Sequence, residues 1–161
     1  MGGGQRSFEE FFHAERDALF RVMCVISGDR QEAEDISQET FARVWERWES
    51  VGTMVNPTGY LHRTALNLFR SRFRRALLAA QRVFDRTPPS DDFQLVEDRQ
   101  VALHALGLLP PRQRAAIVLT EVLRYTAEEA GSMLGIRAST VRALHFQARA
   151  SLREMRDMND E

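Results

Sequence analysis

The stretch between residues 126 and 156 constrains the fold of this chain more than any other. Thr126 and Glu129 have the spacing of a capping box, which satisfies free N–H groups at the start of a helix. Gly135 follows that short helix at a point where the chain needs a positive φ, and a second helix is expected from about 138 to 156. Gly131 provides a small residue where the two helices would cross. The pattern predicts a helix-turn-helix.

The second helix of this pair offers polar side chains that can reach phosphates or base edges. Val141, six residues after Gly135, would lock the helix onto its neighbour. The polar set at the start of the helix and along it is Arg137, Ser139, Thr140, Arg142 and Arg149. A purely structural helical hairpin would share the same turn. We favour DNA binding because the cap, the turn and the charge agree.

The rest of the chain also has helical periodicity. Apolar residues recur at three- and four-residue steps and predict helices over residues 7–27, 29–48, 58–78, 96–109 and 111–123. Gly52, Asn56 and Pro57 predict a loop, and Pro88 and Pro89 lie in an acidic, linker-like segment. We therefore expect an all-α protein with two small helical domains joined by a flexible linker, over residues 1–79, 80–97 and 98–161.

Charge alternates along the chain, although the net charge is only −1 and all 22 basic residues are arginines. Residues 1–50 hold six arginines against eleven acids, residues 58–86 hold seven against one, and residues 112–156 hold eight against four. Solvated helix faces of random sign are the simpler explanation. Two separate basic blocks nevertheless indicate two contacts with a polyanion, and the acidic block indicates a protein partner.

Several function classes find no support in the sequence. Cys24 is the one cysteine, the four histidines are scattered, and neither a nucleophile with a base nor a glycine-rich phosphate loop stands out. We expect no enzyme activity, no cofactor and no metal. The first residues lack an apolar export signal and no apolar run reaches membrane-spanning length, so a cytoplasmic protein without membrane insertion is expected.

Three motifs resemble those of one family. Residues 35–45 (DISQETFARVW), residues 57–61 (PTGYL) with Asn67, and residues 109–142 from LPPRQR to TVR occur in the order of a sigma-70 initiation factor of bacterial RNA polymerase. The chain resembles the extracytoplasmic-function (ECF) type. It departs from the usual pattern at Leu66, Ser71 and Gly131, where Arg, Asp and Ala are common.

The resemblance implies a function and a set of site residues. An ECF sigma factor binds core RNA polymerase through the β′ clamp and β flap, recognises the −10 and −35 elements of promoter DNA and directs transcription initiation. It is commonly controlled by an anti-sigma factor. The implied polymerase-binding residues are Asp35, Gln38, Glu39, Phe41 and Trp45. The implied −10 residues are Asn56, Arg63, Asn67, Arg70, Arg74 and Arg75, and the −35 residues are Arg112, Arg137, Ser139, Thr140, Arg142 and Arg149. The alternative is a stand-alone helix-turn-helix regulator that binds duplex DNA without polymerase.

Overall fold

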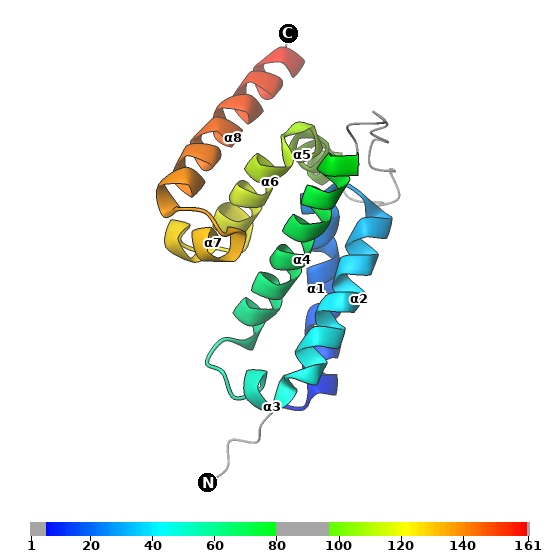
Figure 1. Ribbon diagram of the computed structural model, residues 1–161. Helices are drawn as coiled ribbons and strands as arrows, with labels where there is room; N and C mark the ends of the chain where they lie inside the picture. Colours follow the sequence, from blue (N-terminus) through cyan, green and yellow to red (C-terminus); the bar gives the residue numbers. More distant parts are fainter. Residues whose placement is uncertain (1–5, 80–96, 161) are drawn as a thin grey trace. The chain divides into compact units, whose positions relative to one another are not determined.

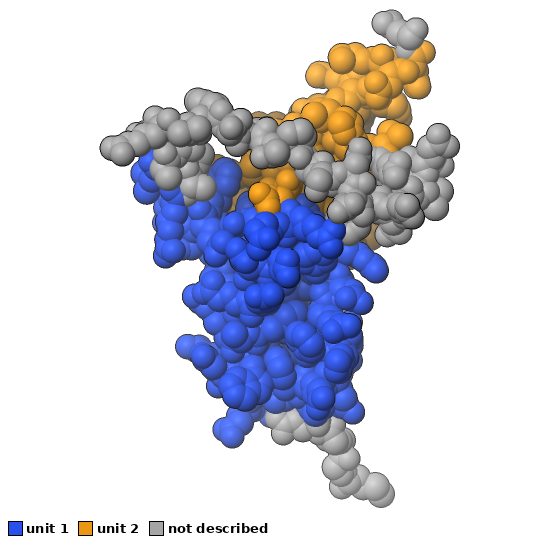
Figure 2. Space-filling model, turned by 90° about the vertical axis from the view of Figure 1, so that its right-hand side faces the viewer, with its two compact units in different colours: residues 1–24, 30–86 blue, residues 25–29, 87–161 orange. Residues whose placement is uncertain are grey.

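The structure is a computed structural model that describes residues 6–79 and 97–160 (Figure 1). Across these ranges the regular structure is helical and contains no strand, which confirms the all-α prediction. The chain divides into two compact units: residues 1–24 with 30–86 form unit 1, and residues 25–29 with 87–161 form unit 2 (Figure 2). The predicted linker at 80–97 lies outside the described residues, apart from Glu97, which begins a helix.

Unit 1 is built from helix α1 (Phe8–Ser27), apart from its residues 25–27, and from helices α2 (Arg30–Glu46), α3 (Trp48–Val51) and α4 (Pro57–Ala79). Local signals explain two of the starts. Ser7 and Glu10 form a reciprocal capping box before α1, and the Asn56 side chain accepts a hydrogen bond from Gly59 N–H at the start of α4. The prediction of one helix through residue 48 was wrong at its end, because the chain turns at Arg47 between α2 and α3.

The core of unit 1 is formed by the apolar stripes of its long helices. Phe11 and Leu19 from α1, Ile36 and Val44 from α2, and Leu61 from α4 are all almost completely buried. Burying each such side chain contributes about 1.5–3 kcal/mol. Helices α2 and α4 lie side by side along their length (Figure 1), so acidic residues of α2 and basic residues of α4 belong to one rigid body.

Two polar groups on these stripes are accommodated in different ways. Glu15, the polar member of the α1 stripe, accepts a hydrogen bond of 3.1 Å from the Thr58 hydroxyl. His62 on α4 is buried, and desolvation lowers its pKa to about 4. His62 is therefore neutral at physiological pH and belongs to the packing of unit 1.

Unit 2 contains α5 (Glu97–Leu108), α6 (Pro111–Ile117), a π-helical turn η1 (Val118–Val122), α7 (Ala127–Leu134) and α8 (Ala138–Asn159). The prediction of a continuous α-helix over 111–123 was wrong in its second half, where Leu123 N–H bonds the carbonyl of Val118, five residues back. Helix α8 packs against both α6 and α7. The long α8 thereby has one face on the core and one face in solvent.

Candidate functional site

The turn between α7 and α8 has the geometry that the sequence predicts. The Thr126 hydroxyl accepts from Glu129 N–H at 3.1 Å, and Thr126 N–H donates to the Glu129 carboxylate at 2.8 Å. Gly135 has φ +67° and ψ 32°, the left-handed conformation that ends a helix. Val141 is completely buried. These contacts confirm the helix-turn-helix.

Gly131 brings the backbones of this motif unusually close together. A Cβ added there would lie 2.7 Å from the carbonyl oxygen of Ile136 and 3.2 Å from the nitrogen of Ala138. The obstacles are backbone atoms, which cannot rotate away as a side chain can. Although alanine is common here in the family that the sequence resembles, this chain needs glycine at residue 131 for its close helix crossing.

Helix α8 presents its predicted DNA-binding residues on the surface of unit 2. Arg137 is exposed at the N-cap position, Ser139 is exposed and Thr140 is half-buried. Arg142 and Arg149 are exposed farther along the helix, and Arg112 is exposed in the first turn of α6. Their accessibility is compatible with the predicted −35 contacts.

Two of these arginines already have carboxylate partners. Arg142 lies 3.1 Å from Glu128 on α7, and Arg149 lies 3.5 Å from Glu121 in the π-helical turn. Glu121 also lies 2.7 Å from His145 Nε2, and the pKa of Glu121 is lowered chiefly by this hydrogen bond. The pairs are exposed to solvent and therefore weak. DNA phosphates could displace these carboxylates at little cost.

Unit 2 also contains a basic groove that the sequence analysis did not single out. The groove has a volume of about 390 Å³ and is lined by Ile117, Glu121, Arg149, Leu152, Arg153 and Arg156. Its arginines follow one another at four and three residues along α8. That spacing places them on one helix face, and it is the sequence signal that could have added Arg153 and Arg156 to the predicted Arg149.

The basic surface of unit 1 follows α4. Arg63, Asn67, Arg74 and Arg75 are exposed and Arg70 is half-buried. Asn56 lies in the preceding loop and uses its side-chain oxygen to cap α4, as described above. By contrast, Leu66 is only 2% exposed and belongs to the core. The arginine that the family usually has at that position is thus replaced here by a packing residue.

The predicted polymerase-binding residues of α2 differ in exposure. Gln38 is exposed, Asp35 and Glu39 are half-buried, and Trp45 is 64% exposed. Phe41 is only 6% exposed and packs edge-on against the Phe12 ring at a centroid distance of 4.9 Å. Phe41 therefore supports α2 from inside, whereas the Trp45 side chain is exposed to solvent on this helix.

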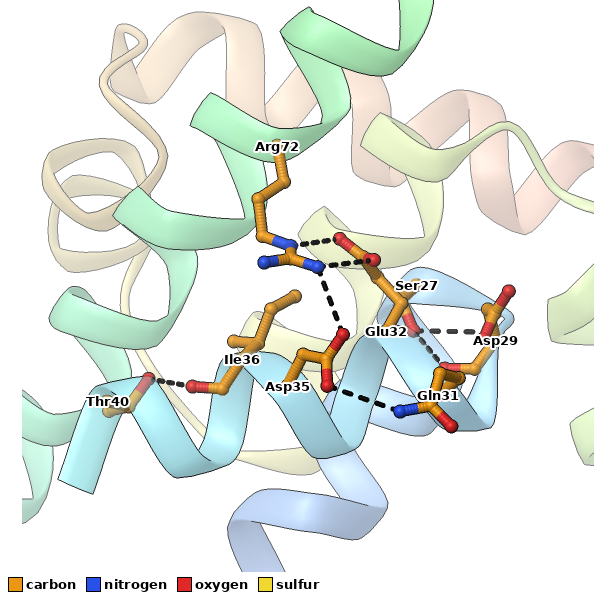
Figure 3. A network of polar contacts seen from close by, with 8 residues as sticks. All are labelled: Ser27, Asp29, Gln31, Glu32, Asp35, Ile36, Thr40 and Arg72. Atoms are coloured by element: carbon orange, nitrogen blue, oxygen red, sulfur yellow. Dashed lines mark hydrogen bonds and ion pairs between the residues drawn. The ribbon is translucent and has the colours of Figure 1, made fainter. Parts of the chain in front are cut away.

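A polar network connects the acidic part of α2 to α4 (Figure 3). Arg72 Nε lies 2.6 Å from Glu32 Oε1, and Arg72 Nη2 lies 3.0 Å from Glu32 Oε2. Nη2 also donates to Asp35 Oδ2 at 3.3 Å, and the Gln31 side chain donates to Asp35 Oδ1 at 3.2 Å. The hydrogen bond to Glu32 raises the pKa of Arg72, so Arg72 is cationic at any pH of interest. Arg72 belongs to the basic block of residues 58–86, and no sequence motif predicted its contacts with α2.

Each of the two units matches a known protein family. Sigma-70 region 2 matches residues 11–77, and Sigma-70, region 4 matches residues 99–152. These two regions together include all the predicted polymerase- and DNA-binding residues. The chain belongs to the sigma-70 family of RNA polymerase sigma factors.

Individual relatives narrow the class to the ECF type. The chain is 35% identical to the ECF RNA polymerase sigma factor SigE of Mycolicibacterium smegmatis, over 92% of this chain and 61% of that protein. It is 32% identical to the RNA polymerase sigma-E factor of Streptomyces coelicolor, over 91% of this chain and 84% of that protein. The chain thus spans less than two thirds of the length of the first relative and most of the second.

A solved structure has the same fold. The sigma factor RpoE of Bartonella quintana, in complex with the anti-sigma factor NepR, matches with a TM-score of 0.73 and 26% identity, over 93% of this chain and 96% of that one. CnrH, in complex with the cytosolic domain of CnrY, matches in fold with a TM-score of 0.61. None of the described helices is long and apolar enough to cross a membrane.

Proposed function

We propose that this protein binds core RNA polymerase and directs it to promoters that carry −10 and −35 elements. The observation that carries the proposal is the arrangement of unit 1. One face of that unit offers Gln38, Asp35 and Trp45 on α2, and α4 of the same unit offers a row of exposed polar and basic side chains. A protein that must hold polymerase and DNA together needs both surfaces on one rigid body.

In this proposal each unit makes its own contacts with polymerase and with DNA. Unit 1, corresponding to the predicted domain 1–79, binds the β′ clamp through α2 and the opened −10 strand through α4. Asn67 is central to the second contact, because its amide can donate to and accept from an exposed base edge. Unit 2, corresponding to the predicted domain 98–161, binds duplex DNA at the −35 element through α8 and meets the β flap.

The remaining parts of the proposal follow from this division. The chain itself performs no chemistry and needs no cofactor, because polymerase catalyses RNA synthesis, and it acts in the cytoplasm where polymerase and DNA are found. An anti-sigma factor holds it inactive by covering the same surfaces. The RpoE structure described above is a complex of this kind, and it supports the proposal for this chain.

The proposal is tested by transcription with purified components. Core polymerase with the full chain should give transcripts that start at defined promoters, and core polymerase alone should not. The Asn67→Ala variant should bind core polymerase normally but fail to open the promoter, as seen by permanganate footprinting. Duplex binding by the chain alone, without association with core polymerase, would instead identify a stand-alone regulator.

A further inference from the structure

Arg72 is the arginine of α4 that the fold separates from the basic surface. Leu61, Ala65 and Leu68 form the core-facing stripe of this helix, and Arg72 follows Leu68 by four residues on the same stripe. Its side chain is only 32% exposed. Arg72 therefore points toward α2, where the apolar core gives way to acidic residues (Figure 3).

The contacts of Arg72 form a clamp across two helices. Its planar guanidinium meets both oxygens of Glu32, a geometry that lysine cannot reproduce. Glu32 lies in the first turn of α2, where the helix dipole also favours a negative charge. The clamp joins residues that are 40 positions apart in the chain.

Asp35 also contacts Arg72, but its intramolecular hydrogen bonds do not occupy all the acceptor sites of its carboxylate. Arg72 binds one carboxylate oxygen and Gln31 binds the other. The Asp35 side chain nevertheless remains 43% exposed. A carboxylate has about four acceptor sites, so Asp35 can accept further hydrogen bonds from a partner while both intramolecular bonds persist.

We propose that Arg72 is a positioning residue for polymerase binding: it fixes Asp35 in the orientation in which α2 meets the polymerase. The inference rests on the proposed function and adds a residue that the sequence motifs do not include. Without Arg72, the carboxylates of Glu32 and Asp35 would repel one another across one turn of α2. Asp35 would then also sample other rotamers, and ordering it again on binding would cost affinity.

The test is a fluorescence titration of core RNA polymerase with the full-length chain. Arg72→Gln should weaken binding about fivefold, the effect of having to order one more side chain when the complex forms. Arg21→Gln is the matched control, because Arg21 is an exposed arginine of α1 in the same unit and has no assigned role. That variant loses the same charge and should bind like the wild type.

A double-mutant cycle distinguishes positioning from general destabilisation. In an Asp35→Asn background, Arg72→Gln should have no further effect on affinity, because the group that it positions is already altered. A merely structural role would cost the same factor in both backgrounds. Circular dichroism checks the fold of each variant. Should Arg72→Gln fail to fold, Arg72→Lys keeps the charge, lacks the fork and should show a similar loss of affinity.

Three results would overturn the inference while leaving the proposed function intact. They are wild-type affinity in the folded Arg72 variants, an equal loss in Arg21→Gln, and an undiminished effect of Arg72→Gln in the Asp35→Asn background. If the wild-type chain does not bind core polymerase at all, the proposed function fails and the inference fails with it.

Discussion

Helix α4 of unit 1 and helix α8 of unit 2 use arginine and close packing in opposite ways. In unit 1 a half-buried arginine, Arg72, joins α2 to α4 through side chains. In unit 2 the arginines of α8 remain on the surface, and α7 meets α8 through backbone atoms around Gly131. Residue type alone therefore does not show whether an arginine stabilises the fold or binds a ligand. Its position relative to the buried face of its helix determines which of the two it does.

The largest effect is expected where unit 2 depends on backbone contact. Gly131→Ala should lower the free energy of unfolding by about 2–3 kcal/mol, because the new Cβ meets the carbonyl of Ile136 and the better helix propensity of alanine offsets only part of the cost. Far-UV circular dichroism in urea measures the loss. Ser132→Ala, at an exposed neighbouring position, is the control.

Tryptophan fluorescence sharpens that test. Trp45 and Trp48, the two tryptophans of the chain, lie in unit 1 and report its unfolding alone. The Gly131 variant should leave the fluorescence transition in place while the dichroism transition shifts. A Gly131→Ala protein as stable as the wild type would show that the backbones can separate without cost.

The next effect concerns the buried histidine of unit 1. The pKa of His62 is about 4 in the folded chain and 6.5 when unfolded, so the unfolded state binds the extra proton as the pH falls between these values. Because of His62, the free energy of unfolding of unit 1 should therefore fall by about 2 kcal/mol between pH 7 and pH 5. Urea unfolding followed by fluorescence at both pH values measures this.

The effect of His62 is isolated by substitution. His62→Gln cannot titrate and should show a smaller loss of stability between pH 7 and pH 5. His13→Gln, at an exposed position of α1, should behave as the wild type does. An identical pH dependence in wild type and His62→Gln would mean that His62 is protonated within the folded unit.

Arg72 should have a smaller effect on stability. Arg72→Gln leaves Glu32 and Asp35 without their common cation, and the free energy of unfolding of unit 1 should fall by about 1 kcal/mol. Fluorescence-detected unfolding in urea gives the value. Arg74→Gln, on the exposed face of the same helix, should unfold like the wild type, and equal losses in the two variants would remove the distinction between the two arginines.

The smallest effect on stability is expected in α8. Arg142→Gln should leave the unfolding transition unchanged, because its pair with Glu128 is exposed. Its affinity for promoter duplex should fall several-fold, and the salt dependence of binding should weaken by about one phosphate contact. Equilibrium binding at several salt concentrations checks both. A destabilised Arg142→Gln variant with normal DNA affinity would show that Arg142 stabilises unit 2 and does not bind DNA.

Local signals explain why so much of the fold could be predicted. The capping box at Thr126, the left-handed Gly135 and the proline at the start of α4 act within a few residues, so the sequence reveals them directly. The π-helical turn after Ile117 escaped prediction because it carries the same apolar periodicity as the α-helix before it. The end of α2 escaped because no glycine or proline marks Arg47.

The amino-acid sequence by itself determined most of the helices, the helix-turn-helix, the polar row on α4 and the family. These depend on short spacings and on motif order. Only the tertiary structure decided that Arg72 turns toward Glu32, that Leu66 and Phe41 are buried while Trp45 is exposed, and that Gly131 cannot gain a Cβ. Each of these depends on atoms brought together from separate helices or across a turn. Helical periodicity shows on which face of its helix a residue lies, but not which residue of another helix it will contact.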